Sequence, residues 1–415
     1  MKVLWVSHFS PYPAKGGAFQ RSFNMLRELS KYHDIDFVSL ASKSTLLSTY
    51  QSEQKGVAEV TTALNQFVTV KSISIIGARA RKLNKFINVI RSTLQFKAYD
   101  ELFYSHPIFS AAIKESLSQN SYDVIYVDTV GLMRSIPNVG LPVILNHHNI
   151  ESEMLSRRAS KAGIIGKLIY SLEAMKMKRI ERKYAPSVQL NITCSELDSK
   201  RLQKIAACKA ECIPNGVDMS YFKRTSCYDI SEVEGIIFIG GLDWYPNADA
   251  MEWFASDIYP VIAESIGEIK VDIIGRGTVN GLSRLASSNK SVKAHGFVDD
   301  ILPFMEKASV YVCPIRDGGG TKLKVLDALA MGVPLVAHPV ACEGINVTDG
   351  KDVLFASTPI EFAKQINRII NEKGLGEKLS QNGIDLIDKY YSYRKIGEKF
   401  GSCVELLGNI PRNNS

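Results

Sequence analysis

The chain contains no long hydrophobic run and no tract of low complexity. Its 415 residues include no uninterrupted apolar stretch of about 18, the length that a membrane-spanning helix needs. The opening residues MKVLWVSHFSPYP have a short apolar run but no small-residue cleavage site. We therefore expect no membrane span, no secretory signal and a cytoplasmic location.

Disulfide and metal-ligand patterns are also missing. The cysteines number seven, which is odd, and no second pair accompanies Cys208 and Cys212 to complete a zinc site. No cluster of carboxylates suggests a metal centre. We therefore expect reduced thiols, no metal and no cofactor. The cysteines are Cys194, Cys208, Cys212, Cys227, Cys313, Cys342 and Cys403.

Three common nucleotide and nucleic-acid signatures are absent. The Walker pattern GxxxxGK(S/T) does not occur, which disfavours a nucleotide hydrolase. No GxGxxG lies at a strand end with a ribose-binding acid downstream, which disfavours a dehydrogenase. No recognised nucleic-acid motif occurs, so we expect no nucleic-acid partner.

The composition is typical of a globular protein, with 45% hydrophobic and 22% charged residues. The length suits two domains of roughly 200 residues each. Residues 1–190 hold 25 Lys and Arg against 14 Asp and Glu, whereas the remainder holds 25 against 29. Two basic stretches, Arg79–Lys97 and Arg157–Lys183, alternate with apolar residues. Each predicts either contact with an anionic membrane surface or an ordinary solvated helix face.

Short apolar runs alternate with helical patterns along the first half. Val3–Ser7 predicts a buried strand, followed by a glycine loop, a helix over Ala18–Tyr32 and a strand over Ile35–Leu40. Such alternation is typical of a parallel sheet covered on both faces. Further strands are expected at Val124–Val127, Val143–Asn146 and Val188–Thr193.

The alternation then restarts after the turn-rich segment Ile213–Asp218 (IPNGVD), which predicts a linker. We expect domains over 1–212 and 213–392, each a Rossmann-like, doubly wound parallel sheet, facing one another across a cleft. Strands are predicted at Ile236–Ile239, Val271–Ile274, Ser291–His295, Val310–Cys313 and Leu335–His338, and helices at Ala248–Ile262, Ile301–Lys307 and Lys322–Met331.

The most informative segment is Pro314–Pro334, PIRDGGGTKLKVLDALAMGVP. Thr321 is predicted to cap a helix that begins at Lys322 and ends at Gly332. Lysines in the first turn oppose the helix dipole unless a phosphate lies there. We therefore predict a diphosphate site at Gly319, Gly320, Thr321 and Lys324. Asp327, one turn further on, is placed to bind ribose hydroxyls, the alternative being a plain surface Lys–Asp pair.

A second glycine loop and a histidine pair follow strands of the first half. Gly16 and Gly17 precede a helix with Arg21 near its start, which indicates an anion site or only a tight turn. His147 and His148 directly follow Val143–Asn146. A histidine there is placed to polarise or deprotonate an acceptor hydroxyl, or else only to satisfy the core.

Three further loops follow strands of the second half. Asn247 is predicted to cap the helix Ala248–Ile262, and Trp244 and Tyr245 either line a sugar pocket or pack. The short GxG at Gly275–Gly277 contains Arg276. The loop His295–Val298 contains Gly296 and Phe297, and its amides are placed to meet a base edge.

These motifs, in this order, resemble family 4 of the retaining glycosyltransferases, which have the GT-B fold. The resemblance rests on IPNGVD, IGGLDWYPNADAMEWF, HGFVDD and GGGTKLKVLDALAMGVPLVAHPVACEGI, and more weakly on PYPAKGGAFQRSFNMLREL. It covers most of the chain. The subgroup that it resembles most makes bacterial exopolysaccharide, capsule or lipopolysaccharide sugars.

The resemblance implies a role for each motif. Gly16 and Gly17 approach the donor phosphates, Gly320, Thr321 and Lys324 bind the diphosphate, and Asp327 binds the ribose. His148 or His147 faces the acceptor, and the loop His295–Val298 holds the base. The last helix, within 393–415, packs back on the first domain.

Two departures from the family pattern stand out. The usual pair of glutamates would fall on Gly319 and Asp327, so the first carboxylate is missing, and Asp317 is the candidate replacement. The usual Arg and Lys after the first strand of the second domain are absent from Leu242–Asn247. Phosphate neutralisation then falls to Lys324, with Lys322 or Arg276 as helpers.

The implied activity is metal-independent transfer of a hexose, with retention, from a nucleotide-sugar donor to a saccharide or lipid-linked saccharide acceptor. UDP is favoured over GDP as the nucleotide. Two alternatives stay open: a sugar-nucleotide 2-epimerase of the same architecture, and a non-catalytic sugar-nucleotide-binding protein. Product analysis with and without acceptor separates all three.

Overall fold

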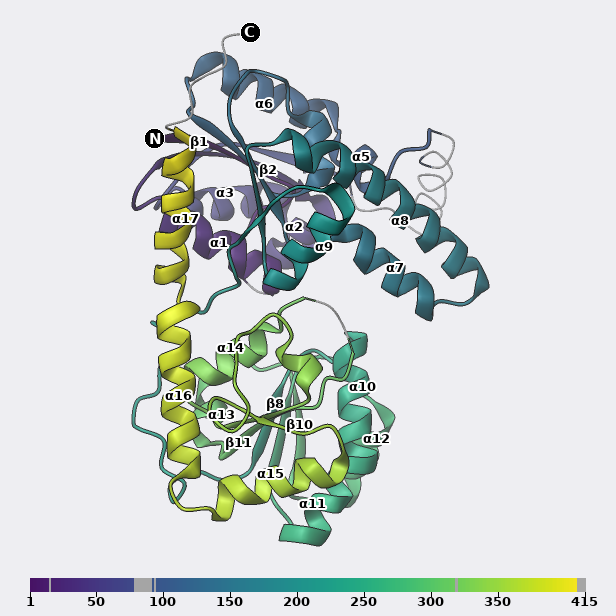
Figure 1. The fold of residues 1–415 in the computed structure, drawn as a ribbon, viewed down its shortest axis with the longest axis vertical. Coiled ribbons are helices and arrows are strands. Elements are labelled where there is room, and N and C mark those ends of the chain that lie inside the picture. Colours follow the sequence, from purple (N-terminus) through teal and green to yellow (C-terminus); the bar gives the residue numbers. More distant parts are fainter. Residues whose placement is uncertain (15, 78–91, 93–94, 318–319, 409–415) are drawn as a thin grey trace. The chain divides into compact units, whose positions relative to one another are not determined.

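A computed structural model describes residues 1–14, 16–77, 92, 95–317 and 320–408. The chain divides into two compact units (Figure 1). Unit 1 comprises Met1–Pro214 together with Ile396–Ser415, and unit 2 comprises Asn215–Lys395. The chain thus passes into unit 2 after Pro214 and returns to unit 1 within its last helix.

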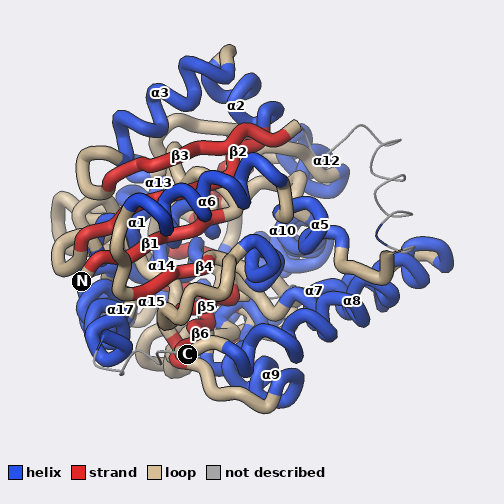
Figure 2. Tube along the Cα trace, turned by 90° about the horizontal axis from the view of Figure 1, so that it is seen from above, coloured by secondary structure: helices blue, strands red, loops and turns tan. Residues whose placement is uncertain are grey.

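Unit 1 is built on a parallel sheet in the order β3-β2-β1-β4-β5-β6-β7, most of which can be followed strand by strand in Figure 2. β1 and β4 are buried along nearly their whole length, as expected for strands covered on both faces. The strands are β1 (Lys2–Ser7), β2 (Asp34–Ser42), β3 (Thr69–Ile76), β4 (Val124–Val127), β5 (Val143–His147), β6 (Leu190–Thr193) and β7 (Glu211–Cys212).

Helices cover both faces of this sheet. Leu4 and Val6 pack towards α6 (Pro107–Gln119) and α8 (Ile164–Tyr184). On the other face, Trp5 stacks on Tyr126 with ring centroids 3.5 Å apart, and Phe400 of α17 (Tyr393–Gly408) packs edge-on against both rings. The remaining helices are α1 (Gly17–Leu29), α2 (Lys43–Tyr50), α3 (Glu53–Leu64), α5 (Tyr99–Tyr104), α7 (Glu151–Lys161) and α9 (Glu196–Ala206).

Unit 2 has a second parallel sheet in the order β10-β9-β8-β11-β12-β13. Its strands are β8 (Ile236–Ile239), β9 (Val271–Ile274), β10 (Val292–Gly296), β11 (Val310–Cys313), β12 (Leu335–Ala337) and β13 (Leu354–Phe355). Its helices are α10 (Tyr245–Trp253), α11 (Tyr259–Ile266), α12 (Asn280–Ser288), α13 (Leu302–Lys307), α14 (Leu323–Ala330), α15 (Pro359–Asn371) and α16 (Leu375–Tyr390). The predicted pair of doubly wound parallel sheets is confirmed.

The expected helix over Ala248–Ile262 is wrong in its start and its continuity. α10 begins at Tyr245 after Trp244, so Asn247 lies inside the first turn and is not the cap. A π-helical turn, Phe254–Ile258, then separates α10 from α11. Pro260 explains the interruption, because it has no N–H to donate to the carbonyl four residues earlier.

The start of α14 also differs from the prediction. Lys322 is the N-cap residue, with extended backbone angles, and the helix begins at Leu323. Thr321 therefore precedes the cap and gives no side-chain capping bond. The helix ends at Ala330 with Met331 as its C-cap, and Gly332, whose φ of 60° lies in the left-handed region, follows directly.

Within the described part of the chain, no helix combines the length and the apolar character that crossing a bilayer requires. The basic stretch Arg79–Lys97 lies largely outside the described residues.

Candidate active site

Lys324 lies at the carboxyl end of β8, in the first turn of α14. Its ammonium donates to Asn247 Oδ1 at 2.6 Å and sits 4.4 Å from the centre of the Phe238 ring. The Asn247 amide in turn donates to the carbonyl of Gly241 at 2.7 Å. This chain of contacts fixes a cation at the strand end, where open α/β sheets bind ligands.

Two glycines make room for this arrangement. A Cβ at position 240 would lie 2.2 Å from Lys324 Nζ and 2.9 Å from Asn247 Nδ2. Gly275 has φ 153°, and a Cβ there would meet the Gly240 carbonyl oxygen at 2.1 Å. The turns after β8 and β9 can therefore approach one another because position 275 lacks a side chain, and Lys324 and Asn247 can lie over the first turn because position 240 lacks one.

Burial sets the charge of this site. Desolvation lowers the pKa of Lys324 to about 8, and it raises the pKa of Asp327 to about 8 although Lys324 opposes that rise. At pH 7 the carboxyl is therefore mostly protonated while the amine is mostly charged. The pair carries net positive charge, which suits an anionic ligand.

Thr321, the residue before the N-cap of α14, contributes an unused polar atom. Its Oγ1 is buried and has no hydrogen-bond partner among the described residues. Gly320 has φ 72°, and its carbonyl accepts from Lys322 Nζ at 3.0 Å. A buried hydroxyl without a partner next to a helix N-terminus is a donor available to a ligand. Gly319 lies outside the described residues.

Arg276, Gly296 and Phe297 come together at the ends of β9 and β10. The Arg276 guanidinium lies 4.6 Å from the centre of the Phe297 ring, which is 52% exposed. The Gly275 amide donates to the Gly296 carbonyl at 2.8 Å, which joins the two loops. The three residues form one exposed cationic and aromatic surface, and their role in holding the donor stays a prediction.

Three other predicted residues of unit 2 lie as follows. Asp317 is half-buried after β11, and its proposed contact with the donor sugar stays a prediction. Trp244 and Tyr245 are 65% and 59% exposed, so they do not serve the core.

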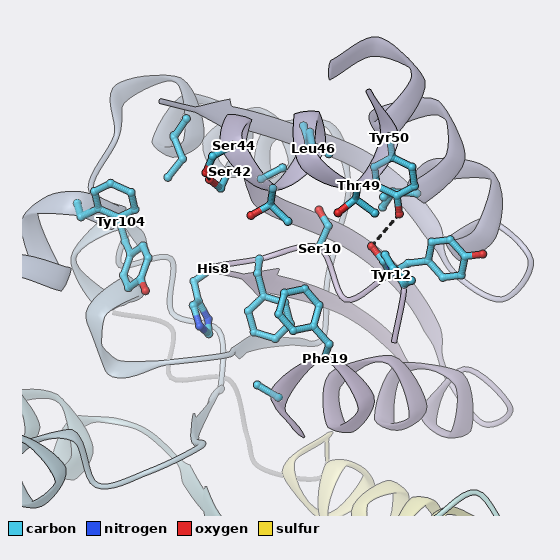
Figure 3. Close-up of a pocket in the computed structure, with 18 residues that line it drawn as sticks. His8, Ser10, Tyr12, Phe19, Ser42, Ser44, Leu46, Thr49, Tyr50 and Tyr104 are labelled. Atoms are coloured by element: carbon cyan, nitrogen blue, oxygen red, sulfur yellow. Dashed lines mark hydrogen bonds between the residues drawn. The ribbon is translucent and has the colours of Figure 1, made fainter. Parts of the chain in front are cut away.

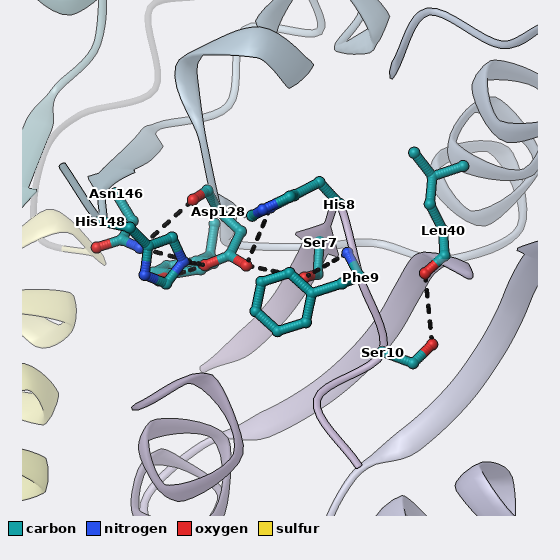
Figure 4. Close-up of polar contacts among 9 residues, drawn as sticks. Ser7, His8, Phe9, Ser10, Leu40, Asp128, Asn146 and His148 are labelled. Atoms are coloured by element: carbon teal, nitrogen blue, oxygen red, sulfur yellow. Dashed lines mark hydrogen bonds and ion pairs between the residues drawn. The ribbon is translucent and has the colours of Figure 1, made fainter. Parts of the chain in front are cut away.

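A second polar group lies in unit 1, where β1, β4 and β5 end (Figure 4). Asp128, fully buried, accepts from His148 Nε2 at 2.9 Å and from Ser7 Oγ at 2.8 Å. His8 Nδ1 lies 3.5 Å from Asp128 Oδ2, the oxygen that also accepts from Ser7. Two histidines thus share one carboxylate. Tyr126 and Asn146 donate further bonds to it at 3.3 and 3.2 Å.

At Asp128, the two histidines lower the pKa of the carboxyl by more than burial raises it. Desolvation alone would raise the pKa of this carboxyl, but charge and hydrogen bonds from His148 and His8 bring it below its usual range. Burial lowers the pKa of His8. Asp128 is therefore a fixed anion that orients His148, whose side chain is 11% exposed.

Comparison with known proteins identifies a domain within unit 2. Residues 234–372, within unit 2, match the family model described as glycosyl transferases group 1. The chain carries a group 1 glycosyl transferase domain. This confirms the expected enzyme class, a glycosyltransferase.

Similar proteins span the whole chain. An uncharacterised 44.6 kDa protein in the cps region of Klebsiella pneumoniae is 21% identical, over 95% of this chain and 97% of its own. The structure of Anabaena HepE in complex with UDP matches with a TM-score of 0.66 at 15% identity, covering 98% of this chain and 100% of its own. A variant of S. aureus TarM in complex with fondaparinux, α-GlcNAc-glycerol and UDP matches with a TM-score of 0.65 at 13% identity, covering 99% and 100%. The GT-B fold of the glycosyltransferase is thereby confirmed.

Several sequence predictions for the glycosyltransferase need correction or restriction. His147 is buried and donates to Asn191 Oδ1 at 3.1 Å, and burial lowers its pKa to about 4. It faces the core, so His148 is the candidate of the pair. Arg21 is also buried and donates to the Pro214 carbonyl at 2.8 Å, which does not fit an exposed anion site. Gly16 caps α1 with φ 101°, Gly17 follows it, and their phosphate role stays a prediction.

The sequence did not single out His8, Asp128 or Gly240, and it indicated Asn247 only as a helix cap. His8, Asp128 and Gly240 each directly follow a predicted strand, the same signal that singled out His148. Applying that rule to every strand would have found His8 and Asp128. Asn247 and Gly240 act through contacts with Lys324, 77 residues from Asn247 along the chain, which no local pattern reveals.

Among the described residues, no group of three or more His, Cys, Asp or Glu side chains is arranged to hold a metal ion.

Proposed function

We propose that this glycosyltransferase moves a hexose, with retention, from a nucleotide-sugar donor to a polysaccharide or lipid-linked saccharide acceptor in cell-surface glycan synthesis. The observation that carries the proposal is the buried cation of Lys324, fixed by Asn247 and Phe238 at a strand end. The buried Thr321 hydroxyl, three residues earlier, has no hydrogen-bond partner among the described residues. These groups suit a diphosphate.

The similar proteins support UDP as the nucleotide and polysaccharide synthesis as the pathway. HepE and the TarM variant were each obtained in complex with UDP, which favours uridine over guanosine here. The TarM complex also contains saccharides, and the Klebsiella relative is named for a cps region, which supports polysaccharide synthesis.

In the proposed reaction, the acceptor oxygen bonds to the anomeric carbon on the face from which the diphosphate leaves. The bond between that carbon and the diphosphate oxygen breaks, and the departing diphosphate takes the acceptor's proton. Lys324, Thr321 and the α14 N-terminus stabilise the charge that develops on the leaving group. His148, held by Asp128, orients the acceptor hydroxyl.

We also propose that the reaction needs no metal ion, because Lys324 and the helix N-terminus supply the positive charge. Activity that is unchanged after dialysis against EDTA supports this. Loss of activity that Mg²⁺ or Mn²⁺ restores contradicts it.

The decisive experiment starts with a thermal-shift screen against UDP, GDP and their common sugar conjugates. A ligand at 100 times its dissociation constant stabilises the protein by about 2.7 kcal/mol. The sugar conjugate that binds is then incubated with saccharide acceptors, and the anomeric configuration of the product is read by NMR. A new glycosidic bond of the donor's own configuration supports the proposal. Isomerised donor without acceptor indicates the epimerase, and binding without turnover indicates the non-catalytic protein.

Peripheral binding to the inner face of an anionic membrane is the second part of the proposal. It rests on the hairpin of α7 and α8, which lie side by side and extend away from the sheet of unit 1 (Figures 1 and 2). Ile164, Ile165 and Leu168 at its tip are 91%, 77% and 73% exposed, and exposed Arg158 and Lys167 flank them. An exposed apolar patch rimmed by cations suits the interface of an anionic bilayer.

Vesicle sedimentation tests this surface. The full chain is expected to sediment with vesicles of phosphatidylglycerol and phosphatidylcholine at low salt, and the triple change Ile164→Ser, Ile165→Ser, Leu168→Ser to weaken binding at least ten-fold. The matched control changes Ile108, Ile360 and Leu406 to Ser, since these are 61%, 71% and 69% exposed on other helices. Sedimentation that is the same with and without vesicles excludes the surface, as does an equal loss in the control.

A further inference from the structure

Unit 1 contains a cavity of about 440 Å³ that no predicted site residue lines (Figure 3). It lies at the carboxyl ends of β1, β2 and β3, between the segment His8–Pro13, α1 and α2. Its volume falls in the range of small-molecule sites, and its place in the sheet is where such folds bind ligands.

The lining combines aromatic faces with hydroxyls. Phe9 and Phe19 form one side, with ring centroids 4.6 Å apart, and Tyr104 lies at the far end. Thr45 and Thr49 of α2 also line the cavity, and neither hydroxyl has a hydrogen-bond partner among the described residues. Flat apolar surfaces opposite free hydroxyls suit a ligand with an apolar face and several hydroxyl groups.

The lining also carries no permanent charge. None of the described residues around the cavity is Asp, Glu, Lys or Arg, and burial lowers the pKa of His8, which favours the neutral imidazole. A carboxylate, phosphate or ammonium group entering this space would lose hydration without meeting a side chain of opposite charge. The ligand that fits is uncharged.

His8 joins the cavity to the polar group of unit 1. Its ring lines the cavity, lies 3.5 Å from Asp128 Oδ2 and packs 5.9 Å from the His148 ring. Phe9, on the same wall, lies 6.1 Å from the His148 ring. A ligand in the cavity therefore has one end beside the Asp128–His148 pair.

We propose that this cavity binds the acceptor sugar as an uncharged saccharide, with the hydroxyl that is glycosylated directed towards His148. The inference rests on the proposed glycosyltransfer and specifies its acceptor. His8 and Phe9 then select a neutral terminal sugar over a uronic acid or a phosphorylated sugar.

Filling the cavity tests this assignment. Thr45→Trp places an indole in the space, and Ser48→Trp places the same side chain on the same helix at an exposed position that does not line it. The probes are methyl glycosides of glucose, galactose, mannose and N-acetylglucosamine, with methyl glucuronide as the charged comparison. Binding is followed by saturation-transfer NMR with UDP present, and UDP affinity is measured separately by calorimetry.

The expected result is that a neutral glycoside binds the parent chain and Ser48→Trp alike, and Thr45→Trp at least ten-fold more weakly, with unchanged UDP affinity in all three. The double change Thr45→Ala, Thr49→Ala, which removes hydroxyls without adding bulk, is expected to weaken glycoside binding five-fold or more. The assignment is overturned if no neutral glycoside binds, if the glucuronide binds as well, or if Thr45→Trp binds normally. Failure of the proposed function appears differently, as the absence of UDP binding by the parent chain.

Discussion

Lys324 and Asp327 show, at the scale of single residues, how burial prepares a site for an anion. Both pKa values lie near 8, one lowered and the other raised, so the two side chains are not an ordinary ion pair at pH 7. Removing a lysine from water is unfavourable unless a counter-charge arrives. In this protein Asn247 and Phe238 hold the cation, and neither neutralises it.

Nucleotide affinity is therefore expected to fall as the pH rises through 8. Lys324 loses its proton there, and Asp327 gains a negative charge, while the terminal phosphate, with a pKa of about 6, keeps constant charge. Between pH 7 and 9.5 the charged fraction of an amine of pKa 8 falls about thirty-fold, and the dissociation constant of UDP is expected to rise accordingly. Calorimetry over this range measures it. Lys324→Arg serves as the control, because a guanidinium stays charged; a flat profile for the parent chain would contradict the assignment.

Asp128 is expected to act as a positioning residue. Asp128→Asn removes the charge that fixes His148 and His8, so kcat is expected to fall about ten- to hundred-fold, with unchanged UDP affinity and an altered pH–rate profile. The matched control is Asp36→Asn, another buried carboxylate of the same sheet that bonds to Tyr122. That variant is expected to lose stability and keep its pH profile. Identical effects of the two changes would mean that Asp128 is only structural.

At the scale of helices and strands, the buried parallel strands were the elements that the sequence predicted best. Buried parallel strands appear as short apolar runs, so β4, β8, β9 and β11 were expected with the bounds they have. The helix starts were harder to place. Thr321 and Asn247 look like caps, but Lys322 and Trp244 take those positions.

Contacts between residues that lie far apart in the chain explain most of what could not be predicted. β1 lies beside β4, and Ser7 bonds to Asp128 across 121 residues of chain. No local pattern pairs those positions. Likewise, the requirement for glycine at 240 arises only once α14 places Lys324 over the turn after β8.

The turn after β8, which contains Gly240, leads to a testable prediction. Gly240→Ala sets a methyl group against Lys324 Nζ, so the flexible ammonium must move away from its place beside Asn247. Donor affinity is expected to fall at least ten-fold, with a stability loss of about 1–3 kcal/mol. Gly241→Ala is the neighbouring control, since the nearest atom to its Cβ is 4.0 Å away. Equal UDP affinity of the two variants, measured by calorimetry, would refute the close-approach argument.

At the scale of the whole molecule, the two units share one helix. α17 begins in unit 2 and enters unit 1 at Ile396, where Phe400 packs on Trp5 and Tyr126. Stability of unit 1 therefore depends on residues that follow unit 2 in the chain.

Phe400→Ala is expected to destabilise unit 1 by about 3–5 kcal/mol and to leave unit 2 unaffected. Fluorescence can report on the units separately, because Trp5 lies in unit 1 whereas Trp244 and Trp253 lie in unit 2. Single-tryptophan variants followed during urea unfolding should show the Trp5 transition at lower denaturant and the unit 2 transition unmoved. UDP should then shift only the unit 2 transition. A common shift of both transitions by Phe400→Ala would contradict this independence.

The return of the chain in α17 also bears on the order in which the protein is completed on the ribosome. Unit 2 is one continuous segment, so it can fold as soon as it has emerged. Unit 1 starts to emerge first but cannot cover Trp5 and Tyr126 until Phe400 has been synthesised. The half that appears first is thus finished last, and during translation its exposed aromatic face is the part of the nascent chain that needs protection from aggregation.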